Sequence, residues 1–170
     1  EVSDSSFVEA AATAGLFVIP TLTVFQSLPE GKPDTATMED PYLQPYLLPL
    51  DLQNLSQPFA GFPQLSAAAG LESVRLLHEA GVPVLAGTDA MNPGTTYGAS
   101  LHRELELLVE AGLSPAEALA AATSATAELF GLTDRGFIRE GLRADLLLVE
   151  GNPVTDILAT RRIIGVWKDG

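Results

Sequence analysis

The feature that most constrains this chain is a short apolar run ending in a carboxylate, the segment Gly81–Ala90 (GVPVLAGTDA). The near-continuous apolar residues over 82–87 predict a parallel strand that is covered on both faces. Asp89 follows at the carboxyl end of this strand, after the small residue Gly87. In an α/β barrel the chemistry sits at that end of the strands. Because an unpaired carboxylate is costly to desolvate, we expect Asp89 to have a partner such as a metal ion, a cation or a hydrogen-bond donor. A plainer interpretation makes Asp89 a turn residue or a helix N-cap.

The first 132 residues alternate helices with buried strands. Apolar periodicity and capping residues predict helices over 3–14, 66–80, 99–111, 115–122 and 125–130. Buried strands are expected over 16–24 and 82–87. From residue 133 the pattern changes to closely spaced short strands, over 137–138, 145–149 and 163–167. This change predicts two parts, 1–132 and 133–170, of which the second is a small β unit.

Residues 29–63 differ from both parts. They hold seven of the twelve prolines of the chain and show no convincing periodicity. A structureless stretch of this length in a compact domain is usually a functional lid or disordered. Because it follows a strand that points toward the active-site face, we expect it to cover a substrate as a lid. The alternative is a variable insertion that packs on the rim of the barrel.

The charge and composition exclude several classes of partner. The net charge is −13, from 22 acidic against 9 basic residues, which argues against a nucleic-acid partner or an anionic membrane surface. No apolar run approaches the roughly 20 residues that a membrane span requires. The chain has no cysteine, so disulfides and thiol catalysis are excluded, while the cellular compartment stays open.

The chain has two histidines, and one of them lies close to Asp89 in the sequence. His102 stands at the start of the helix that follows, so it is a candidate to contact a substrate or to orient Asp89. The alternative is a helix-start residue bonded to local backbone. His102 and Glu106 share a helical face, but a metal site there lacks a third ligand. His78 lies in mid-helix and is interpreted as a structural or surface residue.

Several separate motifs follow one another along the chain: GLFVIPTLTV, GVPVLAGTDA, PGTTYGASLHRELELLVEAGLSPAEALAAAT and GLRADLLLVEGNPVTDI. In sequence and in order they resemble the amidohydrolase superfamily, in particular its imidazolonepropionase-like and prolidase-like branch. The resemblance covers most of the chain and leaves out residues from about 29 to 65. It implies an α/β fold, the C-terminal part of a TIM-type (β/α)8 barrel plus strands of a small composite β-sandwich.

The same resemblance implies a chemistry. It makes the chain part of a metal-dependent hydrolase that cleaves an amide, peptide-like or cyclic C–N bond. Asp89 matches the family's aspartate after the eighth barrel strand, which implies a metal ligand and general base. Tyr97 and His102 are the expected substrate-binding residues. The implied cofactor is a divalent metal, zinc by resemblance, as one or two ions.

Most of the family's metal ligands have no counterpart here. The family pattern needs a His-x-His pair, a carboxylated Lys or a Glu, and two further single His ligands. No His-x-His occurs, and Lys32 and Lys168 lie in the proline-rich segment and in the tail. A complete barrel also takes about 250 residues. We therefore expect an N-terminal part of the same protein to supply the missing ligands and strands.

The expected partners are a small-molecule substrate and this N-terminal part, with homo-oligomerisation left open. Two rival functions remain beside the hydrolase. One is a non-catalytic amidohydrolase-like scaffold that has lost its metal site. The other is an α/β hydrolase or phosphate-binding barrel that uses no metal. The sequence has neither a G-x-S-x-G motif nor a phosphate loop, which counts against the latter.

Overall fold

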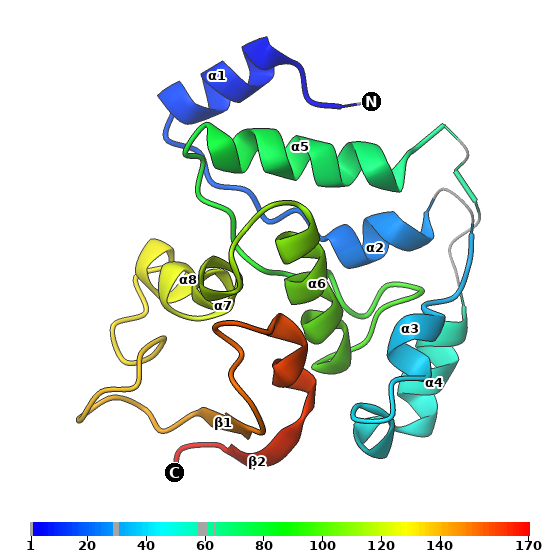
Figure 1. Ribbon diagram of the computed structural model, residues 1–170, viewed down its shortest axis with the longest axis vertical. Coiled ribbons are helices and arrows are strands. Elements are labelled where there is room, and N and C mark those ends of the chain that lie inside the picture. Colours follow the sequence, from blue (N-terminus) through cyan, green and yellow to red (C-terminus); the bar gives the residue numbers. More distant parts are fainter. Residues whose placement is uncertain (1, 29–30, 58–60, 63) are drawn as a thin grey trace.

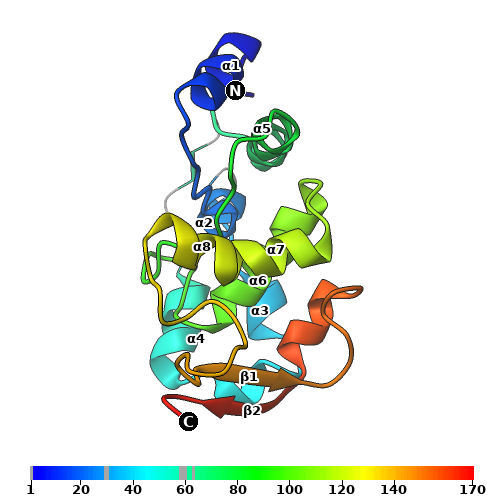
Figure 2. The same ribbon diagram turned by 90° about the vertical axis from the view of Figure 1, so that its left-hand side faces the viewer.

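A computed structural model describes residues 2–28, 31–57, 61–62 and 64–170 of the chain. In Figures 1 and 2 its long axis runs from α1 and α5 at the N-terminal end to a small β-hairpin at the C-terminal end. Helix α6 lies between these ends, with α2 beside it. Within the described residues, no helix is both long and apolar enough to cross a membrane.

The described elements are mostly helical. In chain order they are α1 (Ser5–Thr13), α2 (Leu22–Ser27), α3 (Thr35–Met38), the 3₁₀ turn η1 (Gln44–Tyr46), α4 (Pro49–Ser56), α5 (Ala67–Glu79), α6 (Ala99–Glu110), α7 (Pro115–Ala122), α8 (Ser124–Leu129), β1 (Leu146–Val149), the 3₁₀ turn η2 (Ile157–Arg161) and β2 (Ile163–Trp167). The chain is therefore a mixed α/β structure with a two-stranded antiparallel sheet in its described part.

The helices predicted from apolar periodicity and caps are confirmed. Helix α5 begins after Ser66, whose side chain accepts from the Ala69 amide, and ends before Gly81 at φ +79°. Glycine adopts this left-handed conformation without a Cβ penalty. Helix α7 begins with the expected capping box, in which Ser114 and Glu117 satisfy each other's backbone amides.

The two predicted barrel strands are much shorter than expected. They meet in one parallel bridge, in which the Val18 amide donates to the Pro83 carbonyl and the Leu85 amide donates to the Val18 carbonyl, both at 2.9 Å. The expected strand over 16–24 is wrong at its C-terminal end, because the chain turns at Thr21 (φ +48°) into α2. The expected strand over 82–87 keeps its buried apolar side chains but has no regular ladder in the described residues.

The prediction of a structureless segment over 29–63 is wrong for its described residues. These form α3, η1 and α4, and Leu43 and Leu55 are fully buried. Residues 29–30, 58–60 and 63 of the predicted lid lie outside the described residues. Short helices escaped the prediction because their apolar positions show no repeat longer than one or two turns.

The C-terminal part is confirmed at two of its three predicted strands. β1 and β2 pair antiparallel, from Leu146 opposite Trp167 to Val149 opposite Ile163. Residues 137–138 are not a strand. The neighbours Leu147 and Leu148 point to opposite faces of the sheet, and both are about half exposed. Both faces of this hairpin therefore carry exposed apolar side chains, although Val149 and Ile163 are partly buried.

The main core lies around α6 and α7. It includes Leu107, Leu108 and Ala118, together with Val84 of the parallel bridge and Ile157 of η2. A smaller cluster joins α1 to α5. Since Ile157 belongs to the main core, η2 packs against α6 and α7, and the proposed division into residues 1–132 and 133–170 stays a prediction.

Candidate functional site

Asp89 follows two extended segments that lie in close contact. Gly87 has no Cβ, and a Cβ at that position would clash with the Ile19 side chain. Asp89 itself has φ +48°, and its carbonyl accepts from the Asn92 side-chain amide at 2.7 Å. The Asp89 carboxylate is exposed and has no hydrogen-bond or ion-pair partner among the described residues, so the partner expected for it stays a prediction. The N-cap interpretation is also wrong, because Gly98 occupies the N-cap position of α6.

The loop that follows Asp89 is held in place by α4. The buried Thr96 hydroxyl donates to the Asp51 carboxylate, and the Gly94 amide donates to the Asn54 carbonyl at 2.8 Å. Asp51 also accepts from the Leu48 amide at the start of α4. The segment expected to be a lid therefore packs directly against the loop that carries Asp89.

Tyr97 and His102, the two predicted substrate-binding residues, line one cavity of about 210 Å³. Tyr97 is 70% exposed, whereas His102 is half-buried. The other lining residues come from the segment before α4, from the start of α6 and from β2: Leu43, Tyr46, Leu47, Gly98, Ala99 and Ile163. Asp89 does not line this cavity, so the structure joins two of the three predicted site residues and leaves the third apart.

His102 is held in its neutral form. Burial and, to a smaller extent, the nearby Arg161 guanidinium lower its pKa to about 4, and the Asp40 carboxylate opposes this only in part. The His102 Nδ1 atom is buried without a hydrogen-bond partner among the described residues. The expected bonding to local backbone is therefore wrong, and no hydrogen bond links His102 to Asp89.

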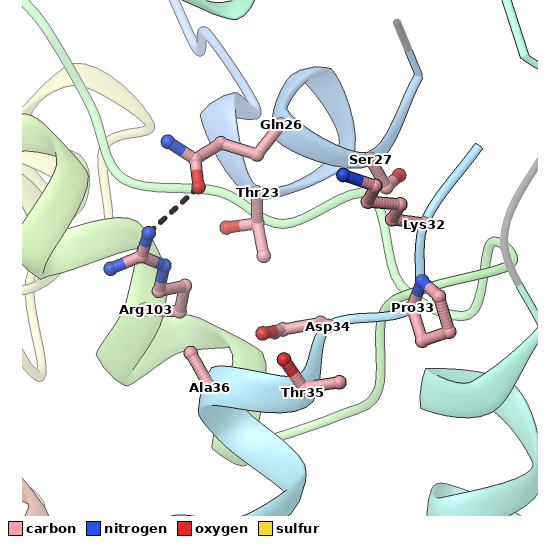
Figure 3. A pocket seen from close by; sticks show the side chains of 9 residues that line it. All are labelled: Thr23, Gln26, Ser27, Lys32, Pro33, Asp34, Thr35, Ala36 and Arg103. Atoms are coloured by element: carbon pink, nitrogen blue, oxygen red, sulfur yellow. Dashed lines mark hydrogen bonds between the residues drawn. The ribbon is translucent and has the colours of Figure 1, made fainter. Parts of the chain in front are cut away.

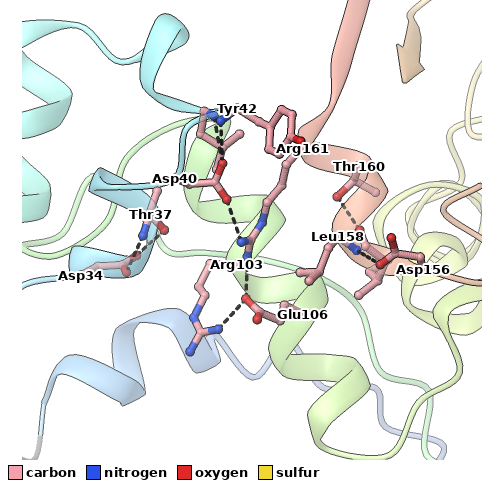
Figure 4. A network of polar contacts seen from close by, with 12 residues as sticks. Asp34, Thr37, Asp40, Tyr42, Arg103, Glu106, Asp156, Leu158, Thr160 and Arg161 are labelled. Carbon is pink, nitrogen blue, oxygen red and sulfur yellow. Dashed lines mark hydrogen bonds and ion pairs between the residues drawn. The ribbon is translucent and has the colours of Figure 1, made fainter. Parts of the chain in front are cut away.

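A nearly buried polar network centres on Arg161 (Figure 4). Arg161 of η2 donates to Asp40 at 2.9 Å and to Glu106 of α6 at 2.5 Å. Glu106 also pairs with Arg103, which donates to Gln26 of α2 at 2.7 Å. These contacts join the segment after α3, helix α6 and the C-terminal part at one point beside His102. No local sequence pattern indicates this network, since its partners lie far apart in the chain.

Glu104 is a fully buried carboxylate that the sequence analysis missed. It accepts from the Leu22 amide at 3.0 Å and from the Thr23 amide and hydroxyl at 2.8 and 2.6 Å. Burial raises the pKa of this carboxyl, and the hydrogen bonds from Thr23 and Leu22 oppose the rise. Its position among the apolar residues of α6, with Leu105 and Leu107 to Leu108 buried beside it, was the available indication that it faces inward.

A second, polar cavity lies between α2, α3 and α6 (Figure 3). Its lining includes Gln26, Lys32, Asp34 and Arg103. Arg103 is already bonded to Gln26 and Glu106, and Asp34 accepts from the Thr37 amide and hydroxyl. These bonds engage the side chains of Gln26, Asp34 and Arg103 within the protein.

The described residues do not assemble a metal site by themselves. No group of three or more His, Asp and Glu side chains among them is close enough to hold an ion. The pair His102 and Glu106 has no third ligand among the described residues. His78 lies 3.8 Å from Glu117 between α5 and α7, which agrees with a structural role.

The chain is similar to several known proteins. The model of the family described as "Amidohydrolase family" matches residues 48–170. The imidazolonepropionase of Deinococcus deserti is 39% identical over 110 residues, which are 62% of this chain and 26% of that protein. A solved amidohydrolase structure has a TM-score of 0.65 at 30% identity, over 98% of this chain and 36% of the other. A solved Xaa-Pro dipeptidase structure has a TM-score of 0.67 at 24% identity, over 98% of this chain and 36% of the other. At this identity the likeness shows the fold alone. The chain thus spans about a quarter to a third of these proteins.

Proposed function

The chain belongs to the amidohydrolase family, and on that premise we propose that it is part of a metal-dependent hydrolase that cleaves an amide, peptide-like or cyclic C–N bond. The similarity to an imidazolonepropionase and to a solved amidohydrolase supports a hydrolytic reaction of this class. Because the chain spans a minor share of both proteins, the active enzyme is proposed to include a further N-terminal part. In this proposal residues 1–132 complete a TIM-type barrel and residues 133–170 complete a small β-sandwich.

The observation that carries the proposal is the position of Asp89. It is an exposed carboxylate at the end of an extended segment, and its side chain has no partner in the described structure. The loop behind it is anchored by Asp51 and Asn54 of α4. A carboxylate that is fixed through its backbone and free at its oxygens is suited to accept a proton from a nucleophilic water and return it to a leaving nitrogen.

Asp89 is also proposed as the one metal ligand that this chain contributes. A divalent ion, zinc by resemblance, would supply a water that is activated for attack at neutral pH. The remaining ligands would have to come from outside the described residues, since these hold no cluster of three ligands. What this chain supplies is therefore the proton acceptor, one ligand and part of the substrate cavity.

The segment from α3 to α4 is proposed to cover the substrate. Leu43, Tyr46 and Leu47 border the cavity that also holds Tyr97 and His102. Both of these residues are proposed to contact substrate there. Since the segment packs against the loop after Asp89, it links the cavity to the proposed proton acceptor.

Hydrolysis can be tested directly in ¹⁸O-labelled water. The intact protein, loaded with zinc, is incubated with a dipeptide, an N-acyl amino acid and a cyclic lactam, and the products are analysed by mass spectrometry. A hydrolase places one ¹⁸O atom in the new carboxyl group and releases an amine. Absence of label in every product, in a protein that binds zinc, would contradict the proposal. Failure to bind zinc would favour the non-catalytic scaffold.

A further inference from the structure

The cavity beside His102 is lined by apolar and uncharged side chains. Leu43, Leu47 and Ile163 supply aliphatic surface, and Tyr46 and Tyr97 supply aromatic rings. No Asp, Glu, Lys or Arg side chain lines it among the described residues. A charged ligand group would therefore lose its hydration here without gaining a countercharge, whereas an apolar group would be favoured.

One side of the cavity is held closed by a contact between distant parts of the chain. The Tyr46 hydroxyl donates to the Ile163 carbonyl at 3.3 Å, across more than a hundred residues of sequence. Leu43, next to this contact, is 2% exposed. The wall is thus built from the predicted lid and from β2, and it shapes the cavity before any ligand enters.

The two ring nitrogens of His102 differ in their surroundings. Nδ1 is buried and has no hydrogen-bond partner, which leaves Nε2 as the nitrogen that the cavity can reach. A proton on Nδ1 would be an N–H donor without an acceptor in a buried position, which is costly. Nearby Arg161 offers only donors, and the nearby Asp40 carboxylate accepts from Arg161 and makes no hydrogen bond with His102 Nδ1. The neutral ring therefore keeps its proton on Nε2.

From this geometry we propose that the cavity binds an uncharged aromatic or aliphatic acyl group of the substrate, and that the His102 Nε2–H donates a hydrogen bond to its carbonyl oxygen. That the bound group belongs to a substrate rests on the proposed function, but binding in the cavity does not depend on turnover. It makes His102 a residue that determines specificity, because it selects a carbonyl acceptor and rejects a cation.

Three small probes of nearly equal shape separate the possibilities: benzamide, benzoate and benzamidine. Benzamide is neutral and carries a carbonyl acceptor, benzoate is an anion, and benzamidine is a cation that has only donors at neutral pH. Binding to the intact protein is followed by NMR titration. We expect benzamide to bind most tightly and benzamidine not to bind at His102. Benzamidine binding as tightly as benzamide would overturn the proposal.

Substitutions at position 102 identify the donor. His102→Leu removes the Nε2–H and should weaken benzamide binding about 5- to 10-fold. His102→Gln keeps an N–H donor and should stay within about threefold of the original. The control His78→Leu alters the other histidine, which lies between α5 and α7, and should not change binding. Equal binding to the Leu and Gln variants would contradict the role of Nε2.

The tautomer of His102 can be tested in the wild-type protein, without any substitution in the cavity. In ¹⁵N-histidine-labelled protein, the His102 ring should show a protonated Nε2 and an unprotonated Nδ1 at neutral pH. A protonated Nδ1 would overturn the proposal. A protein that binds benzamide in this way but hydrolyses no C–N bond would remove the proposed function and leave the cavity assignment standing. Hydrolysis by a protein that does not bind benzamide would remove the cavity assignment and leave the proposed function standing.

Discussion

At the scale of single residues, two small features determine where Asp89 lies. Gly87 lets the Ile19 side chain come into contact with the backbone just before Asp89. Glu104 accepts hydrogen bonds from the backbone amides of Leu22 and Thr23, so the segment that contains Val18 turns away after its one bridge to Val84. Both residues act through close packing across the chain. The sequence therefore located Asp89 at a strand end but could not show that its carboxylate is exposed.

The fit at Gly87 can be tested with an alanine. Gly87→Ala introduces a Cβ that clashes with Ile19, so we expect it to lower the free energy of unfolding by about 1–3 kcal/mol. Gly70→Ala is the matched control, because a Cβ there lies 3.5 Å from the Phe25 ring, an ordinary contact, and alanine favours the helix α5. Denaturant unfolding of both variants checks this. Equal stability of the two would show that the Gly87 contact is unimportant.

The lowered pKa of His102 makes stability depend on pH. The unfolded chain binds a proton below pH 6.5, and the folded chain resists it until about pH 4. The contribution of neutral His102 to the free energy of unfolding is therefore fully present above pH 6.5. It falls by at most about 1.4 kcal/mol per pH unit as the pH drops toward 4. Besides Arg161 and Asp40, the titratable groups around His102 are Glu106 on its own helix and the cavity residues Tyr46 and Tyr97.

The measurement compares the free energy of unfolding of wild type and His102→Gln between pH 7.5 and 4. The variant has no proton to bind at this position, so the difference between the two proteins should shrink as the pH falls. A difference that is constant with pH would contradict the buried neutral histidine.

At the scale of elements, local sequence patterns predicted some pieces and missed others. Helices α5, α6 and α7 were predictable, because apolar periodicity is a local property of the sequence, and α5 and α7 also begin after a capping serine. Helices α3 and α4 were missed because their positions depend on distant contacts, such as Asp51 with Thr96. The family resemblance pointed to Tyr97 and His102, which line one cavity, but it did not point to the cavity wall, which Tyr46 and Ile163 form by a contact between distant parts of the chain.

The Arg161 network predicts that the segment from α3 to α4 adds stability, besides its proposed role of covering a substrate. Asp40→Asn leaves the nearly buried Arg161 with one carboxylate partner, Glu106, in place of two. We expect a loss of about 1–3 kcal/mol and a change in KM larger than the change in kcat. An Asp40→Asn and Arg161→Met double-mutant cycle isolates the pair. A coupling energy of zero would show that the segment is attached by its apolar contacts alone.

At the scale of the whole molecule, much apolar surface is left uncovered. Ile138 is 93% exposed, and Ile164 and Val166 of β2 are both more than 60% exposed. Exposed apolar surface of this extent on a hairpin marks a surface that another part of a protein covers. Together with the one-third coverage of the solved amidohydrolase, this supports a chain that folds with further strands and helices.

We predict that residues 1–170 expressed alone form no stable, active monomer. The uncovered hairpin and the single parallel bridge leave too little burial to offset the ordering entropy. Analytical ultracentrifugation should show aggregation, and co-expression with an N-terminal amidohydrolase part should rescue a soluble complex. Sharp, cooperative unfolding of a monodisperse, active 170-residue monomer would refute this view of the molecule.

The most direct test of the account is the turnover of the Asp89→Asn variant in the intact enzyme. An amide in place of the carboxylate can still ligate weakly but cannot accept a proton, so we predict a loss of about 100- to 10,000-fold in kcat with an unchanged melting temperature. Glu140→Gln, which alters an exposed carboxylate away from the site, serves as the control and should retain full activity. Turnover of Asp89→Asn within threefold of wild type would contradict the assignment of Asp89.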